Sequence, residues 1–286
     1  MAALNNRKIL ITGCSDGGIG AALAAAFHKA GYHVYATTRD SSKMTELASQ
    51  GIETLALDTT SATSIAACVK LVPALDILVN NAGKTFLMPV VDADLAEAKK
   101  VYDVNVWGHI AVTQAFLPLL LASSSGGIIA NQTSVGVCTT LPFQAVYNSS
   151  KAALSMLTDT MRLELEPFGI KVIELRSGVV KTNLIKTLQT STSTTLPENS
   201  IYEPARERLE KSLRQEQFVE TGSDRHQWAE LIVRDLSKKS PKSLIWRGET
   251  AFLCWFLSLL PHGWTDWLAK KLTGLDEVAQ ILRKSK

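Results

Sequence analysis

Short apolar segments alternate with longer segments through about residue 180. The short ones are rich in β-branched residues and apolar at successive positions, which is typical of strands buried in a parallel sheet. The longer ones have the length and apolar spacing of helices that cover such a sheet. The predicted strands are Lys8–Thr12, His33–Thr37, Glu53–Leu57, Ile77–Asn80, Gly127–Gln132 and Ile170–Leu175, and the predicted helices are Ile19–Ala30 and the stretches 61–72, 94–123 and 146–167.

This alternation predicts an α/β fold. Right-handed connections between parallel strands place helices on both faces, so we expect a doubly wound parallel sheet of the Rossmann type. After about residue 183 the pattern changes: Thr187–Ser200 is rich in Ser and Thr and predicts a loop, and the charged residues 201–239 predict helices. Residues 244–272 hold four of the six tryptophans. We therefore predict a single domain with a core (1–185), a loop with helices (186–243) and a Trp/Leu-rich C-terminal helical appendage (244–286).

Composition narrows the classes of partner. The 286 residues are 46% hydrophobic, which is enough for a large buried core. With 30 Lys and Arg against 27 Asp and Glu, the chain lacks the dense basic face that nucleic acids require. The cysteines lie far apart without a CxxC pair, which predicts no metal site and a reduced compartment. The first residues resemble a strand rather than a secretory signal, so we expect a cytoplasmic protein.

A glycine-rich turn joins the first predicted strand to the first predicted helix. It reads Thr12-Gly-Cys-Ser-Asp-Gly-Gly-Ile-Gly20. Gly13 permits a tight turn, and Gly18 and Gly20 remove side chains, so that backbone N–H groups and the helix N-terminus can approach a pyrophosphate. Such a turn alone is a weak signal and also occurs without a ligand. Its place at the first strand–helix junction favours a dinucleotide.

The end of the second predicted strand bears on the choice of dinucleotide. NAD sites usually carry an acidic residue there, which binds the ribose 2′-hydroxyl. Here Thr38 and Arg39 occupy the place, and a guanidinium can bind a 2′-phosphate that a carboxylate would repel. This predicts NADP. Two alternatives stay open: Arg39 is only a solvated surface residue, or Asp40 pairs with Arg39 or takes the role of the acid.

Three further motifs follow the later strands. Asn80-Asn-Ala-Gly83 comes after the fourth strand, and Ser134 ends the fifth. Tyr147 and Lys151 are four residues apart on a predicted helix and share one face. A Tyr-x-x-x-Lys pair arises often by chance, but the order of the motifs, each beside its expected strand, is specific.

Together these motifs and Asn105 resemble the short-chain dehydrogenase/reductase family over about residues 6–185. VYATTRD and VYDVNVWG look closest to the branch that holds 17β-hydroxysteroid dehydrogenases and fungal 1-acyl-dihydroxyacetone-phosphate reductases. The resemblance implies that Tyr147 is the general acid or base and that Ser134 holds the substrate oxygen. Lys151 would lower the pKa of Tyr147 and bind the nicotinamide ribose, and Asn105 would support a water-linked proton path. The implied cofactor-binding residues are Gly13, Ser15, Gly18, Ile19, Gly20, Arg39, Asp58, Asn81, Tyr147, Lys151, Val180 and Thr182.

Two departures from the family pattern stand out. The glycine turn is one residue longer than usual, which leaves Ser15 and Asp16 without a clear place. Ser177-Gly178 replaces the usual Pro-Gly after the sixth strand. Neither change removes a catalytic group.

The predicted function is an NADP(H)-dependent oxidoreductase acting on a carbonyl or secondary alcohol of a lipophilic molecule. The predicted substrate is either acyl-dihydroxyacetone phosphate or a ketone or alcohol of secondary metabolism. A phosphate substrate needs a cation, for which Lys181, Lys186 and Arg206 are candidates. The alternative is a non-catalytic nucleotide-binding regulatory protein.

The tail has its own signal. Ala251–Leu260 is an apolar run of ten residues, well short of the roughly 20 that span a bilayer. Trp264 and Trp267 follow it, and then Lys270 and Lys271, a combination that suits a membrane interface. A substrate-pocket lid and a homo-oligomer contact are the alternatives. Membrane contact through 251–268 would place the protein peripherally on the endoplasmic reticulum or lipid droplets.

Overall fold

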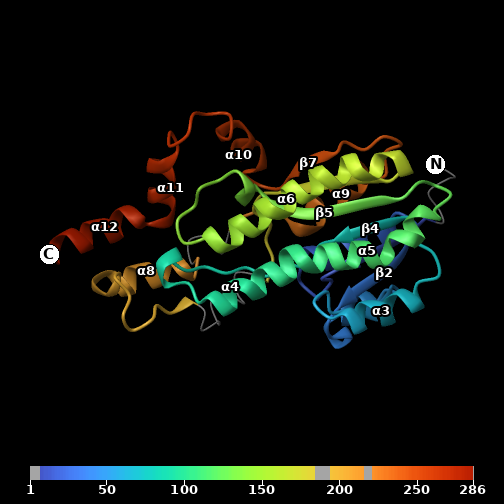
Figure 1. Cartoon of the computed structure of the whole chain (residues 1–286), viewed down its shortest axis with the longest axis horizontal. Helices are drawn as coiled ribbons and strands as arrows, with labels where there is room; N and C mark the ends of the chain where they lie inside the picture. Colours follow the sequence, from blue (N-terminus) through green and yellow to red (C-terminus); the bar gives the residue numbers. More distant parts are fainter. Residues whose placement is uncertain (1–6, 184–193, 216–220, 286) are drawn as a thin grey trace.

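Seven parallel strands form one sheet in the computed structural model, which describes residues 7–183, 194–215 and 221–285 (Figure 1). Their order is β3-β2-β1-β4-β5-β6-β7. The chain thus reverses its direction of winding between β1 and β4, and in such sheets ligands bind beside that reversal, at the carboxyl ends of the strands. The strands are β1 (Lys8–Thr12), β2 (His33–Thr38), β3 (Glu53–Ala56), β4 (Ile77–Asn80), β5 (Ile128–Ser134), β6 (Lys171–Ser177) and β7 (Leu244–Arg247).

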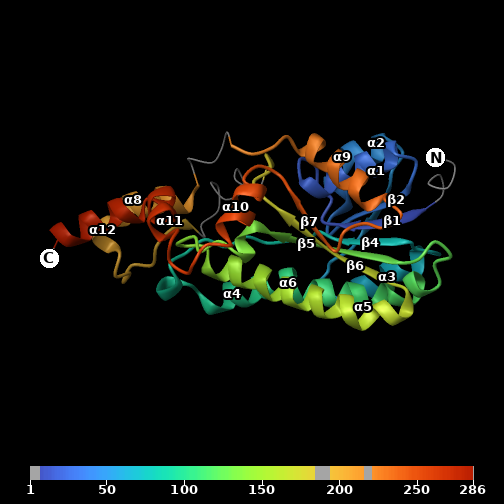
Figure 2. The same cartoon turned by 90° about the horizontal axis from the view of Figure 1, so that it is seen from above.

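Helices cover both faces of the sheet, as Figure 2 shows from above. On one face lie α1 (Ile19–Lys29), α2 (Thr45–Ser49) and α9 (Arg225–Leu236). On the other lie α3 (Ala62–Leu71), α5 (Gly108–Leu121) and α6 (Ala145–Leu165). Each face buries its own apolar cluster, one against α1 and α9 and one against α3 and α5. The predicted doubly wound α/β fold is confirmed.

The sheet extends further along the sequence than predicted. β7 lies inside the segment 244–286 that was expected to form an appendage, and it pairs in parallel with β6, with Leu175 opposite Ile245. α9 likewise belongs to the core, because Trp228 is only 1% exposed within the cluster beside α1. The four-residue strand escaped prediction because its Leu-Ile-Trp-Arg sequence merges with the Trp-rich stretch that follows.

A smaller helical lobe lies at the carboxyl ends of the strands (Figures 1 and 2). It contains α8 (Arg206–Leu213), α10 (Ala251–Leu257), α11 (Asp266–Thr273) and α12 (Leu275–Lys284). α12 packs on α8, with Val278 and Leu209 fully buried in a third apolar cluster. Residues 194–200 of the predicted loop Thr187–Ser200 are largely irregular, and its earlier part lies outside the described residues.

One long helical run has the length and mean hydropathy of a membrane span. It covers Leu95–Leu121 and joins α4 (Leu95–Tyr102), a π-helical turn (Asp103–Trp107) and α5. It is the one such run in the described ranges. Phe116 and Leu120 are fully buried in the cluster on the sheet, so this run serves as a core helix.

Candidate active site

The glycine-rich turn is shaped by close contacts within the protein. Gly13 has a φ of +76°, and a Cβ there would lie 2.8 Å from the Cα of Ala82. A Cβ on Gly20 would lie 2.4 Å from the Gly13 carbonyl oxygen and 2.5 Å from the Asn81 amide nitrogen. Gly20 therefore lets α1 pack against the turn and the loop after β4, and its predicted role at a pyrophosphate stays a prediction. Gly17 has a φ of +79°, so the backbone at this position also favours glycine, which the sequence pattern alone did not indicate.

The start of α1 keeps the features of an anion site. Gly18 is the N-cap residue and carries no side chain to bind the first N–H groups, which begin at Ile19. The first turn holds no acidic residue. A Cβ at Gly18 would meet only the Ser15 carbonyl oxygen, at 3.1 Å, so the approach to the helix end is open. The unpaired N–H groups and the helix dipole favour a pyrophosphate there.

The structure gives Ser15 and Asp16 definite places. The Ser15 hydroxyl lies 3.0 Å from that of Thr38 at the end of β2. The Asp16 carboxylate accepts hydrogen bonds from the main-chain N–H and the hydroxyl of Thr45, at 2.9 and 2.8 Å. The additional residue in the turn therefore ties the turn to the start of α2.

Arg39 directly follows β2 and is exposed. Asp40 is engaged locally, because its carboxylate accepts hydrogen bonds from the N–H and hydroxyl of Ser42. Burial raises the pKa of Asp58, but hydrogen bonds from Thr60 and the positive charge of Arg39 outweigh it and hold that pKa below its usual value. Arg39 thus presents a cation beside the predicted adenosine end of the site.

The predicted catalytic residues Ser134, Tyr147 and Lys151 meet where β5 and α6 come together. The Lys151 ammonium donates to the main-chain carbonyl of Gln132 at 2.8 Å, two residues before Ser134. Burial raises the pKa of Tyr147, and the nearby Ser134 hydroxyl lowers it only in part. Burial lowers the pKa of Lys151 to about 8. The expected lowering of the Tyr147 pKa by Lys151 is therefore not observed, since burial dominates at the tyrosine.

Asn105 lies in the π-helical turn between α4 and α5 and is fully buried. Its side-chain oxygen accepts from the Lys84 N–H at 2.7 Å, and its amide donates to the Lys84 carbonyl at 2.8 Å and to the Ser150 hydroxyl at 3.0 Å. These bonds hold the loop after β4 against α6, and π-turns of this kind often mark functional sites. The water-linked proton path predicted through Asn105 stays a prediction.

Buried polar atoms without a partner gather at the same end of the sheet. Within the described residues they include the side-chain oxygens of Asn81, directly after β4, of Gln132, two residues before the end of β5, and of Ser177, the last residue of β6. Leaving such an atom unpaired costs about 1–3 kcal/mol, so a bound polar ligand is their natural partner. A nicotinamide ring with its carboxamide and ribose hydroxyls fits that chemistry. The Asn81 amide itself holds the glycine turn, donating to the Thr12 carbonyl at 2.8 Å.

The chain after β6 turns past this group of atoms. Val180 forms a main-chain bridge with Ser223 and packs partly against the core, and Thr182 follows it. Ser177 lies opposite Ser134 in the strand register, so both side chains lie on one face of the sheet. The replacement of the usual proline thus adds a buried hydroxyl next to Ser134.

Sequence analysis missed two buried groups that support the site. His109 lies in the first turn of α5, and its Nε2 is 2.7 Å from the Ala82 carbonyl oxygen. Burial, with the charge of Lys151, lowers the pKa of His109 to about 3, so this imidazole is neutral. Below the trio, Glu174 and Arg176 form an ion pair of 2.8 Å. The only feature of the sequence that could have indicated His109 is its position four residues after Asn105, which places both on one side of a helix.

Three residues were predicted as candidate cations for a phosphate substrate, and their surroundings in the structure differ. Arg206 is bonded to Glu203 and Glu210 and to the carbonyls of Leu196 and Pro197, so it braces its own lobe. Lys181 is exposed, and Lys186 lies outside the described residues.

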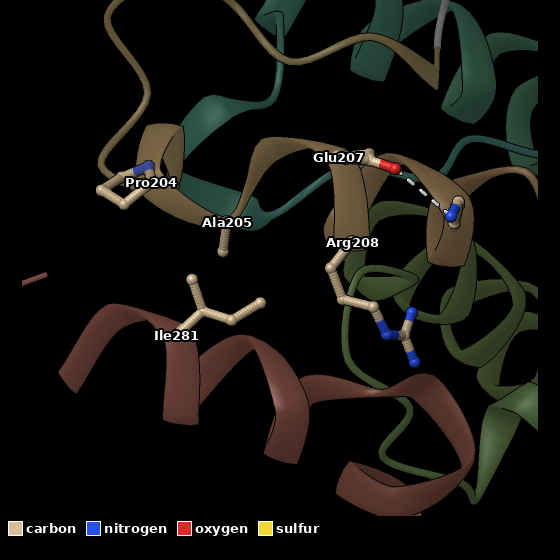
Figure 3. A pocket seen from close by; sticks show the side chains of 6 residues that line it. Pro204, Ala205, Glu207, Arg208 and Ile281 are labelled. Atoms are coloured by element: carbon tan, nitrogen blue, oxygen red, sulfur yellow. Dashed lines mark ion pairs between the residues drawn. The ribbon is translucent and has the colours of Figure 1, made fainter. Parts of the chain in front are cut away.

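A hollow of about 300 Å³ lies between α8 and α12 (Figure 3). Ala205 and Ile281 face one another across it, and none of the residues assigned to catalysis lines it. We therefore do not assign it to the active site.

A parallel sheet whose first strand–helix turn is shaped for a pyrophosphate, with an acid–base pair nearby, defines the class of dinucleotide-dependent oxidoreductases. Within that class the chain belongs to the short-chain dehydrogenase family, whose sequence model, described as short chain dehydrogenase, matches residues 7–193.

Known proteins resemble the chain over most of its length. A short-chain dehydrogenase/reductase of Pestalotiopsis microspora is 52% identical over 277 residues, which are 97% of each chain. An NADPH-dependent 1-acyldihydroxyacetone phosphate reductase of Schizosaccharomyces pombe is 42% identical over 204 residues, covering 69% of this chain and 68% of its own. A crystal structure of a Burkholderia cenocepacia short chain dehydrogenase in complex with NADP has a TM-score of 0.71 at 22% identity, covering 94% of this chain and 98% of that one. The last comparison bears on the fold alone.

Proposed function

We propose that the protein is an NADPH-dependent reductase of a ketone carried by a lipophilic molecule. Three observations support the cofactor: Arg39 after β2, the local engagement of Asp40, and the unpaired polar atoms beside Ser134. The Schizosaccharomyces pombe relative is named as NADPH-dependent, which agrees with this choice.

The observation that carries the proposal is that Tyr147 lies beside the Ser134 hydroxyl and the buried Lys151, whose ammonium is fixed on the Gln132 carbonyl. NADPH, when bound, supplies the hydride. Because the pKa of Tyr147 lies above its ordinary value of 10, its phenol stays protonated near neutral pH and can donate that proton to the alkoxide oxygen as the carbon is reduced. The Ser134 hydroxyl can donate to the same oxygen and orient it. Tyr147 then regains a proton from solvent.

An apolar wall next to the trio supports a lipophilic substrate. Phe86, Leu87 and Met88 follow the Asn-Asn-Ala-Gly motif and are buried with Phe143, which precedes Tyr147 by four residues. The Met88 N–H donates to the Phe143 carbonyl at 2.8 Å, and Phe143 has a φ of +71°, which is uncommon for a residue with a side chain. The loop after β4 is therefore held against the start of α6, with aromatic rings beside the site.

The test is a substrate screen that follows the absorbance of NADPH. It includes acyl-dihydroxyacetone phosphate, the same acyl-dihydroxyacetone without phosphate, and ketones of polyketide, terpenoid and steroid type. Oxidation of NADPH with one class and not with the Tyr147→Phe variant supports the proposal. NADPH binding without oxidation by any ketone would favour the non-catalytic nucleotide-binding alternative. If the protein prefers acyl-dihydroxyacetone phosphate to the same molecule without phosphate, and Lys181→Gln abolishes this preference, the substrate belongs to the acyl-dihydroxyacetone phosphate class.

A further inference from the structure

α10 turns an apolar stripe toward solvent. Phe252, Trp255 and Phe256 lie at helical spacing i, i+3 and i+4, and Leu259 follows at i+7 just beyond the helix. All four are exposed, Phe252 by 76%, whereas Ala251, the first residue of the helix, is buried. A surface helix normally shows the reverse arrangement, with its apolar stripe toward the core. The Phe252 and Trp255 rings contact each other, with their centroids 5.4 Å apart and their planes tilted by 33°.

The exposed apolar surface continues beyond α10. Trp264 and Trp267 are each 66% exposed, and Leu253 beside the stripe is half exposed. We call these seven residues the aromatic face: Phe252, Leu253, Trp255, Phe256, Leu259, Trp264 and Trp267. Soluble monomers rarely expose this many large apolar side chains in one short stretch, and where they do, the stretch binds a partner.

We propose that the aromatic face binds the surface of a lipid bilayer. Tryptophan favours the headgroup level of a bilayer, where its ring is buried and its N–H stays hydrated. Lys270 and Lys271 follow Trp267 by three and four residues on α11, so they lie on its side of the helix, and both are exposed. Lysine is depleted at the centres of protein interfaces, but together with tryptophan it suits anionic headgroups.

The aromatic face is joined to the candidate active site. α10 packs on β7 and on the 3₁₀ turn Val135–Val137, which directly follows Ser134. The Cys138 sulfur lies 4.0 Å from the Cys254 carbonyl oxygen across this contact. Docking of α10 thus brings the carboxyl end of the sheet to the bilayer. That a lipophilic substrate then enters from the lipid phase rests on the proposed function, whereas the docking does not.

The experiment is cosedimentation of the full chain with vesicles of phosphatidylcholine, alone or with phosphatidylserine. The variant is Phe252→Ser with Trp255→Ser and Phe256→Ser. The matched control is Met156→Ser with Leu163→Ser and Phe168→Ser, three side chains as exposed as these on and after α6. We expect the α10 variant to lose about 10-fold or more in vesicle partitioning and the control to match the unchanged protein. Lys270→Gln with Lys271→Gln should weaken binding to the anionic vesicles alone, by roughly 5-fold per lysine.

Three results would overturn the proposal. The unchanged protein does not pellet with either vesicle, or the control loses as much binding as the α10 variant, which would indicate general adhesiveness. Alternatively, light scattering shows that the α10 variant turns a dimer into a monomer while vesicle binding is unchanged, which would assign the face to a second copy of the chain. Vesicle binding is measured without any substrate, so failure of the proposed reaction leaves the test intact. NADPH affinity and the melting temperature of each variant report on its folding.

Discussion

The Lys151 ammonium donates a hydrogen bond of 2.8 Å to the main-chain carbonyl of Gln132, and so joins helix α6 to strand β5. The bond holds Lys151 in a buried position where its pKa is lowered to about 8. The lysine is therefore positioned by the fold itself, and its protonation changes near physiological pH.

The first prediction concerns that titration. As the pH rises through about 8, Lys151 loses its proton, so kcat/KM for NADPH, which reports groups of the free enzyme, should fall above pH 8. Arginine stays charged, so the fall should be absent in Lys151→Arg even though its overall rate is lower. An equal break near pH 8 in both proteins would contradict the assignment to Lys151.

The second prediction concerns Tyr147 and Ser134. Tyr147→Phe removes the proton donor and should lower kcat by about 10²–10⁴-fold, with NADPH affinity unchanged. Ser134→Ala should cost less. Because both side chains are proposed to act on the same substrate oxygen, the double variant should lose much less than the product of the single losses. Fully multiplicative losses would show that they act separately.

The third prediction concerns Arg39. Arg39→Leu should raise the Kd for NADPH by roughly 10–100-fold, the value of one charge-assisted hydrogen bond, and leave the Kd for NADH unchanged. Arg234→Leu, at an exposed arginine on α9, is the matched control. Equal weakening of both cofactors, or a native preference for NADH, would remove Arg39 from the 2′-phosphate site.

The fourth prediction concerns His109 and folding. Its pKa is about 3 in the folded state, below the ordinary 6.5, because of burial and of Lys151. As the pH falls below about 6.5, His109 becomes protonated in the unfolded chain but stays neutral in the folded one. The contribution of neutral His109 to the free energy of unfolding, which is fully present above pH 6.5, is therefore lost progressively toward pH 3. The slope is about 1.4 kcal/mol per pH unit. The control is His109→Gln, which keeps a donor for the Ala82 carbonyl but does not titrate. Between pH 6 and 4, the free energy of unfolding measured in urea should fall more steeply in the unchanged protein than in this variant, by about this slope. Parallel curves would contradict it.

The fifth prediction concerns the unpaired hydroxyl of Ser177. Ser177→Ala removes an atom that has no partner among the described residues, so the melting temperature of the free protein should stay the same or rise. The Kd for NADPH should rise by about 5-fold, the value of one neutral hydrogen bond, while the Kd for 2′-phospho-ADP-ribose, which lacks the nicotinamide, should not change. If both ligands weaken alike, Ser177 serves the fold rather than the nicotinamide end.

Local signals in the sequence predicted the first six strands, because most of them hold a run of buried apolar residues; β3, Glu-Thr-Leu-Ala, was predicted from its place in the alternation of strands and helices. They also predicted the elements that hold the candidate trio, since Ser134 ends a strand and Tyr147 and Lys151 share a helix face. Local patterns could not predict contacts between residues that are far apart in the sequence. The role of Gly20 depends on Asn81 filling the space beside it, and that of Asn105 on the backbone of Lys84.

The packing of α9 on α1 has a consequence for synthesis in the cell. Trp228 and its neighbours close the face of the sheet that α1 begins to cover, yet they follow α1 by roughly 200 residues. At about 5–20 residues per second, a ribosome takes roughly 10–40 s to make that stretch. During that interval the emerging first half carries an open apolar face, so we expect the nascent chain to engage chaperones until α9 leaves the exit tunnel.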